Sequence, residues 1–523
     1  MRPIKGSKKL NVGLLAWLFL TVVATSVSAT TLYVKSGAGG DGTSWSNAFD
    51  TLQQALDVAV SGDQIWVAAG TYKPTSDYGL GGGDRYKHFR MKDGVSIYGG
   101  FPATGTPTMG NRNRVTNATI LNGDLNGSGT LNDGDAYHVF YHPSGTGLSS
   151  TAVLDGFTVT GGYANGSVPH KSGAGMYNDS SSPTITNCTF SGNTVDNDGG
   201  GMSNSNGSNP TITNCTFSGN YAGYAGCGIY VGNGGGMYNN GTNPTITNCT
   251  FSGNSTMSSG AGMVNAYAAS PVLVNCVFSG NSAAGWPGGG GIYNAHSSNP
   301  TLTNCTLSGN NAVTNYGGGM INYNGCSPTL TNCIIWGNSA SVSGNQIYLA
   351  SGDTATLHYC CYANGTNDMG GTGFTINNGI TTDPQFVDPK TTSLAPTTDG
   401  DYHILPGSEA IDAGNNAAVP AGVTIDLDGN PRIVDGNGDG TATVDMGAYE
   451  YPGSPKGDIN GDSSRNISDV ILCLRMSLSL PVTIDGQTTN PPYTLDLMDA
   501  ADINSDAIVN ISDVILCLGL SLQ

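Results

Sequence analysis

Lysine and arginine are almost absent from most of this chain. No Lys or Arg occurs in the 218 positions between Lys171 and Lys390, and the 523-residue sequence has 18 Lys and Arg against 37 Asp and Glu. Glutamate is scarce too, because all but two of the acidic residues are Asp. The formal net charge of −19 leaves no basic patch of the kind that nucleic acids and anionic membranes require. We therefore expect no nucleic-acid partner.

Long apolar runs are missing after the first 29 residues. The start of the chain combines three lysines, an apolar run from Val12 to Val23 and a small-residue end at Ala29, which is typical of a secretory signal peptide. The apolar run is too short to span a bilayer. We expect residues 1–29 to be removed, and the rest to be secreted to the extracellular space with no membrane span.

Helical periodicity is also absent from the central region, which consists of repeats. The run from Pro183 to Asn193 returns five times, at spacings of 27, 34, 27, 29 and 28 residues. A second motif, such as Gly235 to Asn239, lies between copies. A fixed period in this range indicates a solenoid, and short β-branched segments broken by Gly, Asn and Pro predict strands and turns. The sequence therefore predicts an all-β fold, a parallel β-helix in which each coil is stabilised by its neighbours.

Equivalent positions of successive coils should stack into rows, here called ladders. The inward apolar ladder is expected at Ile185, Ile212, Ile246, Leu273, Leu302 and Leu330. A corner should be formed by Asn187, Asn214, Asn248, Asn275, Asn304 and Asn332, whose side chains can bond to one another and to turn backbone. Two further inward ladders should follow the corner, at Cys188, Cys215, Cys249, Cys276, Cys305 and Cys333, and at Phe190, Phe217, Phe251, Phe278, Leu307 and Ile335.

The cysteine ladder has two interpretations. Disulfides are common in exported chains. Stacked coils, however, lie about 4.8 Å apart, which is wider than the Cβ separation that a disulfide prefers. This spacing favours small buried thiols.

The flanks of the repeats carry family resemblances. An amphipathic helix from Asp50 to Ala59, followed by a strand and turn at 62–72, resembles the start of pectin-lyase-like right-handed β-helices, where such a helix caps the first coil. Segments 383–389, 401–414 and 444–450 resemble the closing module of secreted bacterial β-helix proteins of the choice-of-anchor Q kind. These resemblances imply a β-helix at 30–382, a closing module at 383–451 and a linker at 452–456.

Residues 457–523 contain two copies of one calcium loop, each followed by an apolar helix. Oxygen ligands fall at loop positions 1, 3, 5, 9 and 12, and position 7 supplies a backbone carbonyl, as a calcium ion requires. The expected ligands are Asp458, Asn460, Asp462, Ser464, Asn466 and Asp469 in the first loop, and Asp502, Asn504, Asp506, Ile508, Asn510 and Asp513 in the second. Ca²⁺ is thus the expected cofactor, with two ions bound.

The paired loops resemble a type I dockerin, the small helical module that attaches polysaccharide-degrading proteins to cohesin-bearing scaffolds. The resemblance implies a cohesin-type partner, which would hold the protein extracellularly or at the cell surface through the scaffold. It also implies that positions 10 and 11 carry recognition, which are Ile467 and Ser468 in one loop and Ile511 and Ser512 in the other.

The scarcity of basic residues limits the chemistry of the coils. Polysaccharide lyases with the resembling fold use an Arg or Lys as base, which the repeats cannot supply. Only the N-terminal coils offer candidates, namely Arg85, Lys87, Arg90, Lys92, Arg112 and Arg114, and we interpret these as a solvated face or as salt bridges.

Glycoside hydrolysis would need two carboxyl groups at a suitable gap. Asp196 and Asp198 are two residues apart, so an extended backbone would place both on one face, about 7 Å apart. They also fit an ordinary acidic turn, which leaves catalysis open.

The acidic stretch from Asp124 to Asp135, with His138 behind it, is a candidate calcium site or general acid, although a loop insertion between coils is the favoured interpretation. The run from Asp435 to Thr441 repeats the calcium spacing without a position-12 carboxylate.

Aromatic residues are the other resource of the coils. Tyr163, Tyr177, Tyr221, Tyr224, Tyr230, Tyr238, Tyr267, Tyr293, Tyr316, Tyr323 and Trp286 lie in or between the repeats. Such rings can stack on sugars, or they can pack within their own ladder.

Two functions are consistent with the sequence. The first is a polysaccharide-binding or polysaccharide-processing protein on a scaffold. The second is a surface structural protein or adhesin, since the repeats also resemble those of polymorphic outer membrane proteins.

Overall fold

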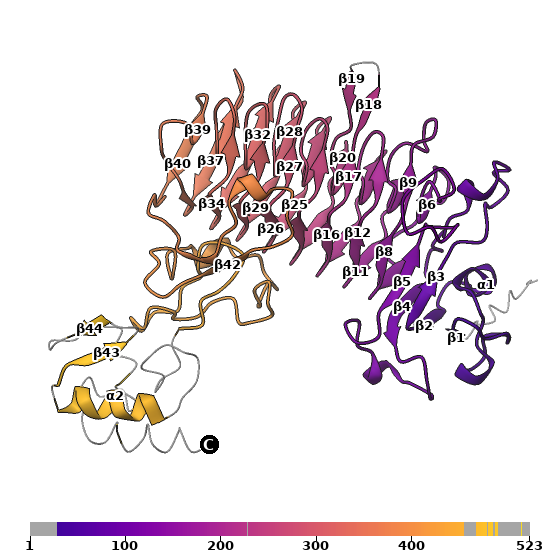
Figure 1. Ribbon diagram of the computed structural model, residues 1–523, viewed down its shortest axis with the longest axis horizontal. Helices are drawn as coiled ribbons and strands as arrows, with labels where there is room; N and C mark the ends of the chain where they lie inside the picture. The colour runs from indigo at the N-terminus through magenta and orange to yellow at the C-terminus, as the bar shows by residue number, and fades with distance from the viewer. Residues whose placement is uncertain are drawn as a thin grey trace, which may run out of the picture.

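The computed structural model describes residues 29–226, 229–453, 467–478, 480–484, 487–489, 501 and 514. The predicted signal peptide, apart from Ala29, and almost all of the predicted calcium ligands lie outside these residues. Within them the chain winds into a stack of coils walled by four parallel sheets, which run side by side along the stack (Figure 1). The predicted parallel β-helix is confirmed.

The four sheets are named A to D. Sheet A comprises β1 (Thr31–Val34), β2 (Gln64–Ala68), β4 (Ser96–Phe101), β7 (Val153–Asp155), β11 (Thr184–Thr186), β15 (Thr211–Thr213), β21 (Thr245–Thr247), β25 (Val272–Val274), β29 (Thr301–Thr303), β33 (Thr329–Thr331), β37 (Ala355–His358) and β40 (Phe374–Asn377). Sheet B comprises β3 (Gly70–Tyr72), β5 (Thr119–Asn122), β8 (Thr158–Thr160), β12 (Thr189–Ser191), β16 (Thr216–Ser218), β22 (Thr250–Ser252), β26 (Val277–Ser279), β30 (Thr306–Ser308), β34 (Ile334–Trp336) and β38 (Cys361–Tyr362).

The other two walls are shorter. Sheet C comprises β6 (Phe140–His142), β10 (Met176–Asp179), β14 (Met202–Ser205), β20 (Met237–Asn240), β24 (Met263–Ala266), β28 (Ile292–Ala295), β32 (Met320–Tyr323), β36 (Ile347–Leu349) and β39 (Met369–Gly370). Sheet D comprises β9 (Tyr163–Ala164), β13 (Thr194–Val195), β17 (Tyr221–Ala222), β23 (Ser255–Thr256), β27 (Ser282–Ala283), β31 (Asn311–Ala312) and β35 (Ser339–Ala340).

The remaining elements decorate the coils. The helices are α1 (Leu52–Val58), α2 (Ile467–Ser477) and the 3₁₀ turns η1 (Trp45–Asn47), η2 (Asp84–Tyr86), η3 (Met109–Asn111), η4 (Thr392–Leu394) and η5 (Asn416–Ala418). Antiparallel pairs are β18 (Tyr224–Gly226) with β19 (Ile229–Val231), β41 (Phe386–Asp388) with β42 (Asp401–Ile404), and β43 (Val482–Ile484) with β44 (Gln487–Thr489). The hairpin β18–β19 accounts for the 34-residue repeat and projects from the stack (Figure 1).

The predicted corner joins sheet A to sheet B. Its six asparagines have φ between 51° and 54°, a left-handed conformation that Asn tolerates better than most residues. Asn275 Nδ2 donates to Asn248 Oδ1 over 3.0 Å, and Asn332 Nδ2 donates to Asn304 Oδ1 over 3.0 Å. The turn therefore repeats from coil to coil, and side-chain amides of neighbouring corners are hydrogen-bonded to one another.

The interior confirms the predicted apolar ladders. The rings from Phe190 to Phe278 stack with centroids 4.6–4.9 Å apart and planes within 5° of parallel. The Ile and Leu ladder beside them is fully buried. The cysteines of the repeats are buried and free, and each thiol, such as that of Cys249, points to a backbone carbonyl. The disulfide alternative is not what the structure shows.

Two buried asparagine ladders were not predicted from the sequence. One joins sheet B to sheet D and comprises Asn193, Asn220, Asn254, Asn281, Asn310 and Asn338. The other lies on sheet C and comprises Asn178, Asn204, Asn239, Asn265, Asn294 and Asn322. In both, the Nδ2 of every member but the last donates to the next Oδ1 over 2.8–3.0 Å, whereas the Nδ2 of Asn322 is buried without a partner. These bonds satisfy polar groups that would otherwise be costly to bury.

The N-terminal end of the stack is covered as expected. Helix α1 begins after Thr51, which forms a capping box with Gln54, and it buries Leu52 and Leu56 in the main core. The parallel pairing starts with the first strand, since β1 pairs with β2 from Thr31, as the expected β-helix at 30–382 requires. Long insertions between these first strands hide the period.

The segment that resembles a closing module folds back along the stack. Its apolar residues Phe386, Ile404 and Met446 pack on Ile334 and Cys361 of sheet B. Backbone contacts tie it to coils far from its own position, since Thr397 N donates to Gly280 O and Ala448 N donates to Thr306 Oγ1. The module thus covers the outward face of the later strands of sheet B, and none of these contacts in the described residues involves sheet C.

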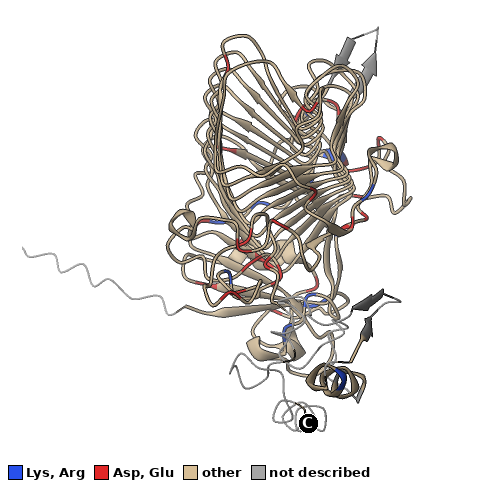
Figure 2. Ribbon diagram, turned by 90° about the vertical axis from the view of Figure 1, so that its left-hand side faces the viewer, with Lys and Arg blue, Asp and Glu red and all other residues tan. Residues whose placement is uncertain are grey.

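Charged residues are concentrated outside the sheets of the coils. The coil walls are almost uncharged, and Figure 2 shows the acidic and basic residues gathered on flanking loops and in the folded-back module. Inside that module the Arg432 guanidinium lies 3.5 Å from the Glu450 carboxylate, both about 1% exposed. A long uncharged wall is consequently available on the coils.

The described part of the tail contains one of the two predicted helices. Helix α2 runs from Ile467 to Ser477 and buries Leu472, Cys473 and Met476. Cys473 is fully buried, and its thiol lies 3.7 Å from the carbonyl of Ala501. No helix in the described ranges is long and apolar enough to cross a membrane.

Candidate functional site

A row of tyrosines lies on the outward face of sheet C. In register from coil to coil it comprises Tyr141, Tyr177, Ser203, Tyr238, Val264, Tyr293, Ile321 and Tyr348, here called the sheet-C row. From Tyr238 onward, a tyrosine occupies every second coil. Coils repeat at about 4.8 Å, so these rings recur at roughly twice that distance. For Tyr177, Tyr238 and Tyr293 the sequence had suggested either sugar stacking or packing within the ladder.

Tyr141 is buried, and the other four tyrosines of this row are half-buried. Val264 and Ile321, between them, are 1% exposed, because the tyrosines and the glycine-rich turns flank them. Burial raises the pKa of Tyr238, and the nearby Asp198 charge raises it further. Burial likewise raises the pKa of Tyr293. These phenols therefore stay protonated and can donate hydrogen bonds from an otherwise apolar strip.

Two large aromatic side chains beside the row are well exposed. Trp286 is 61% exposed and meets the ring of Tyr323 edge-on, with centroids 5.5 Å apart. Tyr267 is 58% exposed and stacks on the ring of His296 at 4.9 Å. Each pair is thus held in position by a neighbour while one ring faces solvent.

The first coils of sheet C carry a packed group of histidines, of which the sequence analysis had named only His138. His138 Nε2 lies 3.0 Å from His170 Nδ1, and the His138 ring stacks on Tyr141 at 4.7 Å. His88 packs edge-on against Tyr141 at 5.2 Å. Burial lowers the pKa of His88 to about 3 and that of His142 to about 4. These histidines are neutral at physiological pH, so they act as hydrogen-bonding packing groups.

Most of the basic residues that were expected to form a solvated face or salt bridges form salt bridges or hydrogen bonds. Arg85 pairs with Asp133 at 3.1 Å, Lys87 with Asp84 at 2.7 Å, and Arg112 with Asp155 at 2.9 Å. Lys92 donates to two carbonyls at the end of α1, and Arg114 donates to Asn187. The salt-bridge interpretation is thus confirmed for three of the six.

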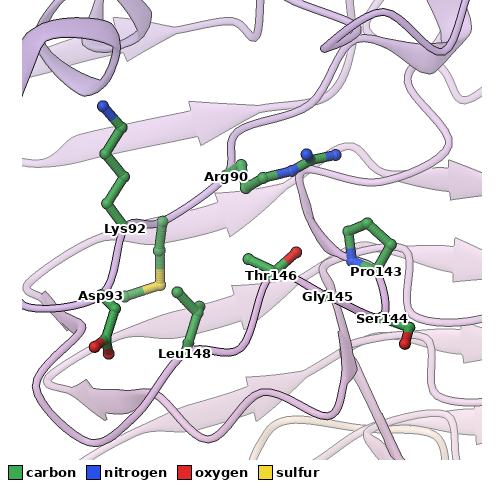
Figure 3. A pocket seen from close by; sticks show the side chains of 9 residues that line it. Arg90, Lys92, Asp93, Pro143, Ser144, Gly145, Thr146 and Leu148 are labelled. Carbon is green, nitrogen blue, oxygen red and sulfur yellow. The ribbon is translucent and has the colours of Figure 1, made fainter.

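Arg90 differs from the other basic residues in this region. Its guanidinium lies 4.3 Å from the ring centroid of Tyr78 and 3.1 Å from His88 Nε2, and its Nε is buried without a hydrogen-bond partner. It borders a surface pocket of about 460 Å³ between residues 90–93 and the turn at 143–148 (Figure 3). This pocket is a small polar recess at the end of the sheet-C row.

The predicted catalytic pair lies at the edge of the same surface. Asp196 and Asp198 follow β13 on either side of Asn197. Asp198 accepts hydrogen bonds from Asn233 Nδ2 at 3.0 Å and Asn197 Nδ2 at 2.6 Å. Burial raises the pKa of Asp198 to about 6, against these hydrogen bonds. Burial also raises the pKa of Asp196, which the charges of Arg85 and Lys171 oppose. The two hydrogen bonds that the Asp198 carboxylate accepts from side-chain amides give this residue a turn-forming role.

Replacing Asp198 by asparagine should leave the melting temperature within about 2 °C of the wild-type value. An Asn side chain at this position keeps one of the two hydrogen bonds that Asp198 accepts and loses the other. The substitution also removes a negative charge that is costly to bury. Thermal unfolding followed by circular dichroism checks this, with Asp196→Asn as the matched control. A fall of about 5 °C or more for Asp198→Asn alone would show that its carboxylate holds the coil together.

The metal ligands predicted in the tail fall almost wholly outside the described residues, which include only the helical backbone of Asp469 and, among the recognition residues, Ile467 and the exposed Ser468. Within the part of the chain that the structure describes, no three His, Cys, Asp or Glu side chains form a metal-binding group. In the 435–441 loop, Asp435 Oδ2 accepts the amide of Gly440. That loop closes on its own backbone.

Comparison with known families decides the classification. The family described as "Right handed beta helix region" matches residues 108–311 and 236–405, together more than half of the chain. The chain belongs to this family. Membership of the β-helix family agrees with the parallel sheets and places no chemistry on the coils, because one fold carries many functions.

Solved structures similar to this β-helix include one described as "Crystal structure of pectate lyase Pel9A", with 14% identity, a TM-score of 0.43, and coverage of 81% of this chain and 97% of that one. Another, described as "Rhamnogalacturonan lyase", has 14% identity, a TM-score of 0.40, and coverage of 72% and 97%. No curated protein matches the sequence. Because both TM-scores and both sequence identities are low, we base no argument on these two structures.

Proposed function

We propose that this protein is a secreted, polysaccharide-associated β-helix that binds a linear glycan along the outward face of sheet C. The observation that carries the proposal is the sheet-C row, a regular strip of half-buried tyrosines flanked by the exposed rings of Tyr267 and Trp286. Aromatic rings present apolar faces together with polar edges, which suits sugars. A repeating surface also suits a repeating polymer.

The surroundings of the row support a neutral or weakly anionic glycan as ligand. The coils between Lys171 and Lys390 have no Lys or Arg, so a highly charged polyanion would meet no counter-charge along most of the row. The recess at the end of the row is lined by two cationic side chains, Arg90 and Lys92. We therefore assign acidic sugars, where present, to that end of the surface. The proposal requires binding and leaves turnover open.

The tail supplies the second half of the proposal. Its duplicated loop spacing fits two calcium ions, and the burial of Cys473 beside Ala501 supports a tail in which the two halves pack together. We propose that calcium folds this dockerin-like module and that Ile467, Ser468, Ile511 and Ser512 face a cohesin-type partner. The β-helix would then be delivered to a polysaccharide-degrading assembly.

The glycan surface is tested by the Trp286→Ala and Tyr267→Ala variants. Each lost stacking contact is worth about 0.5–1.5 kcal/mol, which corresponds to roughly a 2- to 12-fold weaker affinity. Native affinity gels containing a soluble glycan measure the retardation. Val272→Ala serves as the control, because Val272 is 42% exposed on sheet A. Equal retardation of the two aromatic variants and the wild type would contradict a role for sheet C.

A further inference from the structure

The insertion between β5 and β6 has the spacing of a complete calcium loop. Counted from Asp124, its twelve residues place side-chain oxygens at positions 1, 3, 5, 7, 9 and 12; these residues are Asp124, Asn126, Ser128, Thr130, Asn132 and Asp135. Position 6 is Gly129 with φ 71°, where such loops need glycine for a sharp turn. This match is closer than that of the tail loops, which have Ser463 and Ala507 at position 6.

The side chains of the loop converge in the structure. Asp124 accepts backbone amides of Gly127 at 2.6 Å and Gly129 at 2.9 Å, so the chain curls around its carboxylate. Asn126 Nδ2 lies 2.7 Å from Asn132 Oδ1, and Asn132 Nδ2 lies 2.7 Å from Ser128 Oγ. Positions 3, 5 and 9 therefore meet around one point.

An independent observation comes from the last residue of the loop. Asp135 is 0% exposed; its Oδ2 accepts the amide of Asn132 at 2.7 Å, while its Oδ1 is buried without any hydrogen-bond partner. A buried carboxylate oxygen with no partner is costly, and a bound cation would supply the missing partner.

We propose that residues 124–135 bind one Ca²⁺, with Asp124 and Asp135 as the charged ligands and with oxygens of positions 3, 5, 7 and 9 completing the shell. Such a set has two carboxylates and four neutral oxygens, which suits a hard cation that prefers oxygen ligands. It is a site within the β-helix, separate from the two loops expected in the tail. It therefore does not depend on the proposed glycan binding or on the cohesin interaction.

Two basic residues beside the loop limit its affinity. Lys73 Nζ lies 3.5 Å from the carbonyl of Leu125, and Arg85 contacts the carbonyl of Asp135 at 3.0 Å and the carboxylate of Asp133 at 3.1 Å. With two ligand charges and two neighbouring cations, binding should fall in the range of roughly 0.1–1 mM that extracellular calcium modules show. Calcium would hold Arg85, which also binds Asn165, in a fixed position beside the coils.

Hydrogen–deuterium exchange of the full-length protein tests this site without interference from the tail, because each loop is read in its own peptides. In about 5 mM calcium, above the range expected for such modules, amides of residues 127–135 should exchange at least 10-fold more slowly than in EDTA. Asp135→Asn should remove this protection, since Asn keeps the hydrogen bond from Asn132 but lacks the ligand charge. Equal protection in the wild type and in Asp135→Asn would overturn the proposal.

Asp133→Asn is the matched control, because it removes the same charge from loop position 10, where the side chain is 82% exposed and points to Arg85. It should keep the calcium-dependent protection, and a loss as large as that of Asp135→Asn would show non-specific attraction only. If Asp135→Asn proves misfolded, judged by faster exchange of amides 184–191, Asp124→Asn replaces it. Absence of calcium-dependent protection in the wild type would also refute the site.

Discussion

Replacing Phe251 by alanine should lower the free energy of unfolding by about 3–5 kcal/mol, the range found for large aromatic residues removed from a core. Phe251 is fully buried between Phe217 and Phe278, with ring centroids 4.8 and 4.6 Å away. Alanine would leave a cavity with two unsupported faces, and neighbouring coils cannot close it because their backbones are fixed by the sheets. The midpoint of urea denaturation, followed by circular dichroism, measures the effect.

Two variants make this prediction specific. Phe251→Leu should lose less than Phe251→Ala, because the same ladder continues with Leu307 and Ile335 in later coils. Thr250→Ala, which changes the adjacent outward position, should stay within about 0.5 kcal/mol of the wild type, as surface substitutions usually do. If Phe251→Ala unfolded at the wild-type urea concentration, the stacked aromatic ladder would not be a main source of stability.

Removing calcium should unfold the tail completely while the β-helix remains folded. The carboxylates of each predicted loop repel one another until a cation neutralises them, so the free energy of calcium binding becomes free energy of folding. In the full-length protein, amides of α2 (Ile467–Ser477) should be protected from exchange in millimolar calcium and should exchange freely in EDTA. Amides of the coils around Phe251 should be unaffected.

The double change Asp458→Ala and Asp502→Ala removes position 1 of both loops and should reproduce the effect of EDTA in the presence of calcium. Since Ser463 and Ala507 occupy the position where glycine is usual, the calcium affinity of the tail should be lower than that of typical loops of this kind. Protection of α2 that is identical in EDTA and in calcium would show that the tail folds without metal, against the dockerin-like interpretation.

The coil architecture could be read from the sequence because each repeat carries the same residues at the same places. The corner asparagines, the cysteines and the Ile and Phe ladders all lie where the 27–29-residue period placed them. The same period also contained the buried ladders of Asn193 and Asn178, but an asparagine repeated in a turn motif was not recognised as an inward residue. Alternation along two-residue strands such as β13 is too short to show which side faces in.

The accessible surface could not be predicted, since it depends on what covers each sheet. The later strands of sheet B are covered because the 383–451 segment folds back over them, and no feature of the repeats predicts that contact. The histidines around Tyr141 come from insertions far apart in sequence, at 88, 138 and 170. Likewise, the pair Asp196 and Asp198 was identified by spacing alone, whereas Asn233, which binds Asp198, belongs to the next coil.

Retention of the wild-type protein by immobilised polysaccharides tests the central claim most directly. A panel of neutral and acidic plant and algal glycans should be screened in affinity gels, with release of reducing ends and of unsaturated products measured on the same glycans. The account predicts retardation by at least one linear glycan, weakened by Trp286→Ala and unchanged by Val272→Ala, whether or not the glycan is cleaved. Mobility unchanged across the whole panel, with no cleavage, would contradict it and would favour a structural or adhesive role for the β-helix.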